Sequence, residues 1–402
     1  MGIQNSITHT IIIPYNTIIT PNTHFSTTLS EILLSSTITT IPRNIIRTTQ
    51  LKMSGDLVLL TGATGFLGYQ TLIQLIKSGY KVRAAVRSLA KTEKIRNGPS
   101  FKALAPTDEQ LSFVSVPDMT AKGAFDEAVK GVKYIVHIAS PIPTFGEGEP
   151  PAADQLESVF VGPARAGVVG LLESANAAPG GTVKRVVVTS SAVANVPFYY
   201  FMGQGKDLDT RIFNADERIP VAEGPYGFEF AAYSAGKAAA LAAVDDFVRD
   251  NKTTFDAINI LPAWIFGTDE LVSEAANMRA GSTNSVLLGV VTGVKSEIPN
   301  TGNAVKGSDV ALAHVRALDP KVAGNQSFGL SSDIVWEDAI TLAQKYHPEA
   351  FKNGQLSSGT QPTLPMHWDV SKTEKILGIK LAGFDQMVKE VTDEYLQLLT
   401  KA

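Results

Sequence analysis

From residue 56 onward, short and almost wholly apolar stretches alternate with longer amphipathic ones. A strand that is apolar throughout is buried on both faces, as in a parallel sheet covered by helices on each side. The pattern therefore predicts an α/β fold with a doubly wound parallel sheet of the Rossmann type. The predicted strands are DLVLL (56–60), YKVRAAVR (80–87), LSFVSV (111–116), KYIVHIAS (133–140), VKRVVVTSS (183–191) and FDAINILPAWIFG (255–267).

The pattern becomes less regular after about residue 267. It contains RAGSTNSVLLGVVTG, typical of loops, and ends in FDQMVKEVTDEYLQLL, which predicts a helix. The chain shows no internal repeat and no low-complexity linker after residue 53. We therefore expect a Rossmann domain over residues 53–267 and a smaller C-terminal substrate-binding lobe over residues 268–402, packed on it.

Residues 1–52 differ in kind from the rest of the chain. They are rich in Thr, Ile and Ser, and Glu31 is their only acidic residue. They lack the early positive charge and unbroken apolar core of a secretory signal. A mitochondrial presequence is also poor in acids, but it carries more arginines than Arg43 and Arg47. We expect a disordered extension on a cytoplasmic protein, with a mitochondrial presequence as the alternative.

Composition excludes several classes of function. A formal net charge of −4 without a basic run argues against nucleic acid and anionic membrane surfaces as partners. The chain has no cysteine, and its six histidines lack metal-binding spacing, so we expect no disulfide and no metal. No apolar run approaches the ~18 residues of a membrane span. We expect a monomer or homodimer that acts on a small molecule.

A glycine-rich turn follows the first predicted strand, in the sequence LLTGATGFLG. Three glycines between a strand and a helix permit a tight turn, a close approach of backbone N–H groups to a pyrophosphate, and close packing of the helix. The position after a strand and before a helix is the context that this motif requires. The predicted cofactor-binding residues here are Gly62, Ala63, Thr64, Gly65, Phe66, Leu67 and Gly68.

The end of the second strand indicates which dinucleotide binds. NAD-binding proteins usually carry an acid there, whereas this chain has Arg87, with Lys91 four residues later. A guanidinium can bind a 2′-phosphate through two donors, so we expect NADPH/NADP as the cofactor. The alternative for Arg87 is a plain surface cation. Asp118 and Met119 follow the third strand and are predicted to contact the adenine, although Asp118 is equally suited to a turn or helix cap.

The stretch AAYSAGKAAALAAV (231–244) predicts a helix on which Tyr233 and Lys237, four residues apart, share a face. Ser190 and Ser191 end the fifth strand, at the sheet edge where ligands lie in such folds. A nearby ammonium favours the phenolate, so we expect Lys237, together with the positive charge of the bound nicotinamide, to lower the pKa of Tyr233 from its usual ~10 toward neutrality. The three side-chain types together indicate a site for proton transfer.

In this order, T-G-x-x-G-x-x-G, T-S-S, Y-x-x-x-K and LPAWIFG resemble the short-chain dehydrogenase/reductase superfamily, in its extended epimerase/dehydratase branch. Over residues 53 to about 395 the chain most resembles fungal aldehyde and ketone reductases related to dihydroflavonol reductases. The resemblance implies that Ser191 holds the substrate oxygen and that Tyr233 transfers the proton. It also implies that Lys237 binds the nicotinamide ribose and tunes Tyr233, and that Pro262 seats the nicotinamide.

We therefore expect an NADPH-dependent reductase of an aldehyde or ketone. A nucleotide-sugar epimerase or dehydratase is an alternative that Arg87 disfavours, and a 3β-hydroxysteroid-type dehydrogenase is another. A non-catalytic NADP sensor is a fourth, but such proteins typically lack the Tyr–Lys pair. The sequence FAAYSAGK departs from the N-W-Y-C-Y signature of cinnamoyl-CoA reductases, which argues against a CoA thioester substrate.

Several other residues have a structural explanation. His137 is expected to be a hydrogen-bonded core residue. Aromatic residues 198–203 suit a substrate pocket and a core equally well, and core packing is expected of Trp264, Trp336 and Trp368.

Overall fold

The computed structural model describes residues 55–145 and 149–401, and all of them belong to one compact unit. The disordered extension predicted for residues 1–52 lies outside the described residues. Within the described part of the chain no helix is long and apolar enough to cross a membrane.

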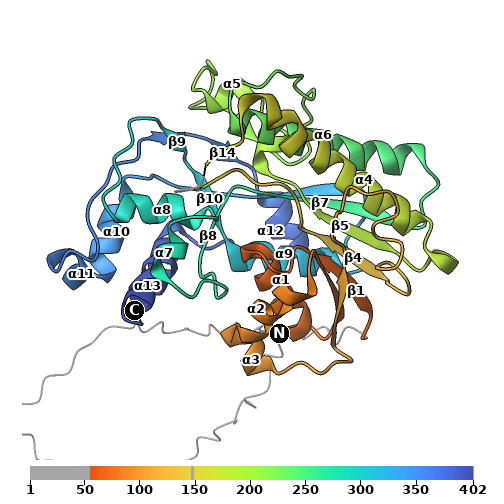
Figure 1. The fold of residues 1–402 in the computed structure, drawn as a ribbon. Coiled ribbons are helices and arrows are strands. Elements are labelled where there is room, and N and C mark those ends of the chain that lie inside the picture. Colours follow the sequence, from red (N-terminus) through yellow and green to blue (C-terminus); the bar gives the residue numbers. More distant parts are fainter. Residues whose placement is uncertain (1–54, 146–148, 402) are drawn as a thin grey trace, which may run out of the picture. The chain divides into compact units, whose positions relative to one another are not determined.

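A seven-stranded sheet forms the centre of this unit (Figure 1). Its strands follow the order β11-β7-β5-β4-β1-β2-β3, and every neighbouring pair is parallel. This arrangement confirms the doubly wound parallel sheet predicted from the apolar stretches. The strands are β1 (Leu57–Thr61), β2 (Lys81–Val86), β3 (Leu111–Ser115), β4 (Tyr134–His137), β5 (Arg185–Thr189), β7 (Asp256–Pro262) and β11 (Gln326–Leu330).

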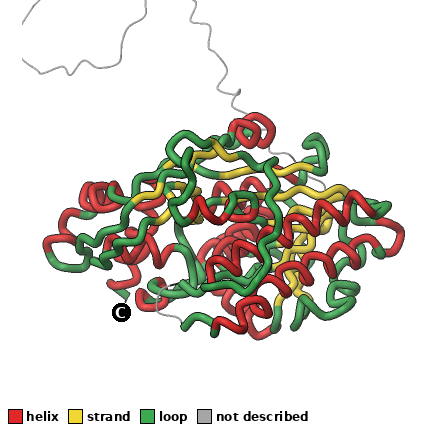
Figure 2. Tube along the Cα trace, turned by 90° about the horizontal axis from the view of Figure 1, so that it is seen from above, coloured by secondary structure: helices red, strands yellow, loops and turns green. Residues whose placement is uncertain are grey.

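Helices cover both faces of the sheet, and Figure 2 shows strands lying between helices. On one face, α1 (Phe66–Lys77) and α9 (Gly307–Ala317) pack against residues such as Val58 of β1. On the other face, α4 (Gly162–Asn176) and α6 (Glu229–Asp250) pack in one hydrophobic cluster with Leu59, which follows Val58 in β1. Successive side chains of a strand point to opposite faces, so a strand between two helical layers must be apolar throughout.

Two segments assigned from the sequence to the C-terminal lobe lie in the layers of this sheet instead. The strand β11 pairs with β7, and α9 packs against α1, so the chain returns to the sheet after residue 267. The stretch predicted as one strand over 255–267 is also two strands. The first, β7, ends at Pro262, and β8 (Trp264–Phe266) continues in a separate three-stranded sheet of order β12-β10-β8.

A second core fills the remaining part of the unit, around Phe266, Trp336 and Val391. Trp336 is fully buried, and its indole N–H donates to the Thr301 carbonyl at 2.9 Å, so it is a packing residue as expected. The elements here are β9 (Asn300–Thr301), β10 (Asn303–Lys306), β12 (Ser332–Asp333), β13 (Thr363–Leu364), α7 (Ala275–Met278), α8 (Asn284–Val291), α10 (Asp338–Tyr346), α11 (Pro348–Lys352) and α13 (Phe384–Leu399).

Short elements complete the described chain. These are α2 (Thr92–Asn97), α3 (Pro99–Leu104), α5 (Phe198–Phe201), α12 (Ser371–Leu377), β6 (Ile212–Phe213) and β14 (His367–Trp368), with short helical turns at Leu89–Lys91, Ala153–Gln155, Glu157–Val161, Pro179–Gly181 and Ala192–Ala194.

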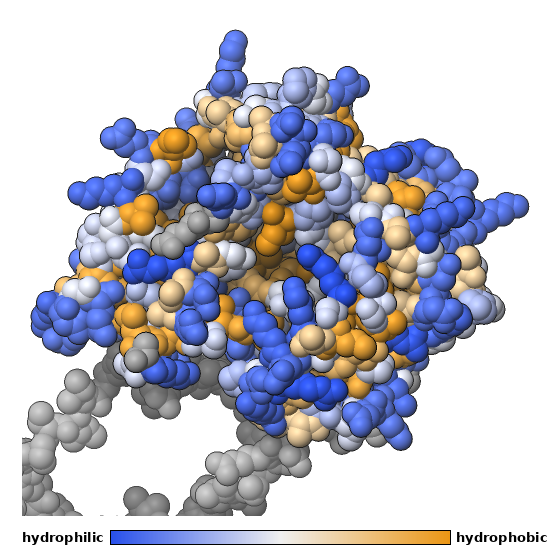
Figure 3. Space-filling model, in the orientation of Figure 1, coloured by the Kyte–Doolittle hydropathy of each residue, from blue (hydrophilic) through white to orange (hydrophobic). Residues whose placement is uncertain are grey.

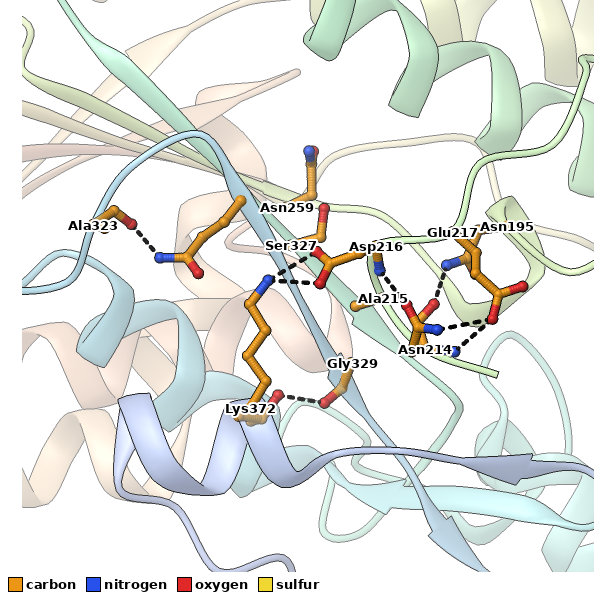
Figure 4. Close-up of polar contacts among 12 residues, drawn as sticks. Asn195, Asn214, Ala215, Asp216, Glu217, Asn259, Ala323, Ser327, Gly329 and Lys372 are labelled. Carbon is orange, nitrogen blue, oxygen red and sulfur yellow. Dashed lines mark hydrogen bonds and ion pairs between the residues drawn. The ribbon is translucent and has the colours of Figure 1, made fainter. Parts of the chain in front are cut away.

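Residues 214–218 join the loop after β5 to the far edge of the sheet (Figure 4). The Asn195 side chain donates to the Asn214 carbonyl at 2.7 Å, and Lys372 of α12 contacts Asp216 at 2.8 Å. Arg218 donates to Ser327 of β11 at 2.9 Å. These contacts attach the segment that follows Ser191 to two other elements and so limit its movement.

A buried arginine links the amino-terminal ends of the central strands β5 and β7. Arg185 at the start of β5 pairs with both carboxylate oxygens of Asp256 on β7, at 2.6 and 2.8 Å. Its other N–H groups donate to the carbonyls of Ala317, Asp319 and Val322, at 2.7–2.9 Å. Because Arg185 is only 5% exposed, its removal leaves several of these acceptors without a partner and without access to water.

We expect Arg185→Met to lower the free energy of unfolding by about 3–5 kcal/mol, as for other broken buried pairs. Chemical denaturation would measure the change. Arg249→Met is the matched control, because Arg249 and its partner Asp246 are mostly exposed and such pairs contribute about 0–1 kcal/mol. If the two substitutions lowered the free energy of unfolding equally, the stabilising role of the buried Arg185 would be contradicted.

Candidate active site

A cavity of about 840 Å³ opens at the carboxyl ends of the central strands. Glycine-turn residues line one part of it, the ends of β2, β5 and β7 line others, and β8–β10 close a further side. Figure 3 shows apolar surface gathered in a hollow in the middle of one face of the molecule. Ligands bind at this edge of an open α/β sheet, because the loops that follow the strands diverge there.

The glycine turn brings the start of α1 close to β1. Gly62 has a positive φ of 78°, and the Gly65 N–H donates to the Gly62 carbonyl at 3.0 Å. A Cβ on Gly68 would overlap that same carbonyl oxygen, so no other residue fits this position without a shift of the backbone. The turn therefore has the compactness that a pyrophosphate cradle requires. All its predicted residues line the cavity except Ala63, which is fully buried in the core.

Thr61 and His137 fix the ends of β1 and β4 beside this turn. The Thr61 hydroxyl accepts the N–H groups of Ile138 and Ala139, each at 3.1 Å, and donates to Nδ1 of His137 at 2.9 Å. Burial, with a contribution from Lys237, lowers the pKa of His137 to about 3, so its ring is neutral. His137 is therefore a hydrogen-bonded core residue, as the sequence analysis expects.

The predicted adenine end of the cavity has two charged lining residues, Arg87 and Asp118. Arg87 follows β2, is exposed, and makes no hydrogen bond or ion pair with any described residue. Lys91 lies in the helical turn Leu89–Lys91 and does not line the cavity. The Asp118 carboxylate accepts the N–H and hydroxyl of Thr120 at 2.8 and 2.6 Å, which lowers its pKa. Asp118 thus stabilises a turn, while Met119 and Asp118 both line the cavity.

The helix α6 carries both Tyr233 and Lys237 to the cavity. A Cβ on Gly236 would lie 2.8 Å from the Phe160 carbonyl oxygen, so the helix can approach the turn Glu157–Val161 only because this position is glycine. Small residues along α6 allow the same close approach to α4. The composition of the stretch 231–244 thus serves to pack the helix beneath the site.

Lys237 is a buried cation with few partners. It is 5% exposed, and its Nζ donates to the Thr189 carbonyl at 3.3 Å. The same Nζ lies 5.9 Å from the centre of the Tyr233 ring. Burial lowers the pKa of Lys237 to about 8, because the charged form loses hydration that one carbonyl does not replace.

The pKa of Tyr233 differs from the lowered value that the sequence analysis expects. Burial raises it to about 12, although the side chain still borders the cavity, and a hydrogen bond with Ser191 offsets this only in part. The predicted lowering by Lys237 is not seen, because desolvation of the phenolate dominates in the protein's own environment. Tyr233 therefore keeps its proton at neutral pH. Ser191 is the serine that contacts it, whereas the buried Ser190 hydroxyl has no partner among the described residues.

The wall beyond Tyr233 is rich in aromatic residues, of which the sequence analysis named only those of 198–203 as candidates for a pocket. Trp264 was expected in the core, yet its ring lines the cavity 6.1 Å from that of Phe145. Phe201 lines it too, whereas its neighbour Tyr200 is buried against Phe213. Residues 198–203 therefore serve both pocket and core. The remaining wall residues include Ile142, Phe230, Pro262, Thr283, Thr301 and Asn303.

Only part of this wall had a signal in the sequence. Phe230 stands three residues before Tyr233, on the same helical face, and Trp264 stands two residues after Pro262. Thr301 and Asn303 carry no such signal, because their place depends on the pairing of β10 with β8. Among the described residues no group of three or more His, Asp or Glu side chains could hold a metal ion.

Comparison with known proteins gives consistent matches. Residues 58–327 match the model of the NAD dependent epimerase/dehydratase family. The chain is 36% identical over 363 residues to the ketoreductase CTB6 of Cercospora nicotianae, covering 87% of this chain and 97% of the relative. It is 29% identical over 369 residues to a putative NADPH-dependent methylglyoxal reductase, GRP2, of Candida albicans, covering 86% and 99%. The fold matches yeast methylglyoxal/isovaleraldehyde reductase Gre2, crystallised with NADPH, with a TM-score of 0.72 at 23% identity, covering 86% of this chain and all of the other.

The buried ammonium predicts an unusual effect on stability. Because the pKa of Lys237 falls from 10.5 to about 8 on folding, the folded protein holds this proton less tightly than the unfolded chain. The charge therefore destabilises the fold fully below pH 8, and the effect disappears as the pH rises to 10.5. We expect Lys237→Met to raise the free energy of unfolding at pH 7 by about 1–3 kcal/mol, with no gain at pH 10.5.

Denaturation curves at several pH values would measure this gain. Lys352→Met is the control, because Lys352 is exposed and its loss should leave the pH dependence of stability as in the wild type. A destabilised Lys237→Met at pH 7 would contradict the prediction.

Proposed function

The chain belongs to the NAD dependent epimerase/dehydratase family, and we propose that it is an NADPH-dependent reductase that converts a ketone or aldehyde to the alcohol. The observation that carries this proposal is the grouping of Ser191, Tyr233 and Lys237 at one cavity whose far wall is aromatic. Such an arrangement suits the delivery of a proton to the oxygen of an apolar carbonyl compound. The ketoreductase and reductase names of the relatives support the same activity.

The cofactor half of the cavity fits NADPH. The glycine turn leaves no side chain between the backbone and a pyrophosphate at the start of α1. Arg87 supplies a cation that no described residue neutralises, at the end of the strand where NAD-binding proteins usually carry an acid. Lys237 would donate to the nicotinamide ribose, and Pro262 would border the ring. When bound, NADPH supplies the hydride.

The protein's part in the reaction is to position the carbonyl and to supply a proton. As the carbonyl carbon receives the hydride, negative charge develops on its oxygen. The Ser191 hydroxyl holds that oxygen by a hydrogen bond, and the Tyr233 hydroxyl transfers its proton to it, which completes the alcohol. A donor with a raised pKa keeps its proton until a strong base forms beside it, and the developing alkoxide is such a base. The Lys237 ammonium stabilises the tyrosinate that remains.

The nucleotide-sugar alternative is disfavoured by the charges around the cavity. A sugar nucleotide brings a second diphosphate, which cationic side chains usually bind. Among the described residues, the charged groups that line the cavity are Arg87, Asp118 and Lys237, all on the cofactor side.

The cytoplasmic location and the monomeric or homodimeric state expected from the sequence stay predictions.

We expect Tyr233→Phe to lower kcat by about 10²–10⁴-fold, because it removes the proton donor and keeps the ring. NADPH binding, measured by fluorescence titration, should be retained. NADPH oxidation by purified protein against aromatic aldehydes, β-keto esters and flavanonols provides the assay. Phe230→Leu is a useful comparison, since it alters the same wall without touching the proton donor. More than a tenth of wild-type kcat in Tyr233→Phe would argue against this role.

We expect the wild type to prefer NADPH over NADH and Arg87→Asp to reverse that preference. A charge-assisted contact with the 2′-phosphate should give a change of more than about tenfold in the ratio of kcat/KM values. Lys91→Asp should shift the ratio less, because Lys91 does not line the cavity. Equal kcat/KM values for the two cofactors in the wild type would refute the assignment of Arg87.

A further inference from the structure

A buried histidine on α9 contacts the end of the strand that leads to Ser191. His314 is fully buried, and its Nε2 lies 2.7 Å from the hydroxyl oxygen of Thr189, the last residue of β5. Its Nδ1 lies 2.7 Å from the Val310 carbonyl oxygen, one turn earlier in α9. The proposed reaction gives His314 no task, although Thr189 lines the cavity.

The Val310 carbonyl determines which nitrogen of His314 carries the ring proton. A carbonyl oxygen can only accept a hydrogen bond, so Nδ1 is the donor in this contact. Burial lowers the pKa of His314 to about 4, so the ring is neutral at pH 7 and Nε2 carries no proton. Nε2 must then accept, and the Thr189 hydroxyl donates to it. The single proton of that hydroxyl is therefore used in the bond with His314.

Thr189 is also the residue whose carbonyl accepts a hydrogen bond from Lys237. The Lys237 Nζ donates to this carbonyl at 3.3 Å. On the side of β4 the last paired residue of β5 is Val188, so Thr189 lies one residue beyond that ladder. A residue at a strand end is held less firmly by the sheet, and a side-chain bond then contributes more to its orientation. The bond with His314 therefore helps to fix where the Thr189 carbonyl points.

Two titratable side chains lie near the Lys237 ammonium, and both are uncharged at neutral pH. The Tyr233 ring lies 5.9 Å away on the same helix and keeps its proton. His137 on β4 is kept neutral by burial. Because neither group supplies a negative charge, the position of the Thr189 carbonyl affects how well the charged form of Lys237 is stabilised.

We propose that His314 is a positioning residue for Lys237: it holds the Thr189 side chain so that the Thr189 carbonyl stays within reach of the ammonium. The inference rests on the proposed function, in which Lys237 binds the nicotinamide ribose and stabilises the tyrosinate. His314 does not line the cavity, so it acts only through Thr189. Without the acceptor on His314 the carbonyl can turn away, which weakens the charged form of Lys237 and lowers its pKa further.

The test measures the pKa of Lys237 in the whole chain before cofactor is added. Lysines carrying an NMR-active isotope at Cε are titrated, and the Lys237 signal is the one missing from the spectrum of Lys237→Met. We expect the proton affinity of Lys237 to fall about tenfold in both His314→Leu and Thr189→Val, because the ammonium loses a charge-assisted hydrogen bond. Thr189→Val keeps the shape and the carbonyl, so it gives this readout even if His314→Leu fails to fold.

His314→Gln and Thr373→Val are the matched controls. The side-chain oxygen of glutamine can accept from the Thr189 hydroxyl, so His314→Gln should keep the pKa of Lys237 as in the wild type. The buried Thr373 donates to the Gly329 carbonyl at 2.6 Å, away from the cavity, so Thr373→Val should destabilise the fold without changing that pKa. An unchanged pKa in Thr189→Val, or an equal fall in either control, would overturn the proposal.

The titration of Lys237 needs neither cofactor nor turnover, and this separates the inference from the reductase activity. A lowered pKa in the variants, with no NADPH oxidation by the wild type on any carbonyl compound, would support the positioning role and refute the reductase. Turnover by the wild type, with the same Lys237 pKa in all variants, would do the reverse.

Discussion

The site depends on the close contact between Gly62 and Gly68. Because Gly68 has no Cβ, the first turn of α1 can lie directly on the carbonyl at the end of β1. That contact sets where α1 begins, and α9 in turn packs on α1. A side chain at Gly68 would therefore move the glycine turn and the start of α1 together.

The proposed proton donor and its lysine neighbour are held at the expense of stability. Lys237 is buried as an ammonium with a single carbonyl acceptor, and Tyr233 is buried so that its phenolate is disfavoured. Burying the Lys237 ammonium and the Tyr233 hydroxyl does not stabilise the fold, since uncharged side chains would pack on α6 without a desolvation penalty. Both make sense at a reaction centre, where a protonated phenol must meet a developing alkoxide and a cation must stabilise the tyrosinate left behind. The helix tolerates them because Gly236 and its alanine neighbours hold it tightly against the rest of the layer.

The sequence predicted those features that local pattern determines. Continuous apolar stretches identified the strands, and the spacing of the glycines and of Tyr233 and Lys237 placed two groups at one sheet edge. The strand β11 escaped prediction because QSFGL is short and partly polar, and only its pairing with β7 makes it a strand of the sheet. The desolvation that raises the pKa of Tyr233 was not predicted for a related reason: burial depends on distant elements, whereas the nearby lysine is visible in the sequence.

The two halves of the cavity are built by different kinds of contact. The cofactor half comes from strand ends and one glycine turn, and changes there disturb the sheet. The substrate wall comes from β8, β9 and β10, which lie outside the large sheet and pack on the second core around Trp336. This wall is therefore separate from α6, which carries Tyr233 and Lys237 to the cavity. The topology thus allows the wall to vary while the Tyr–Lys helix keeps its place.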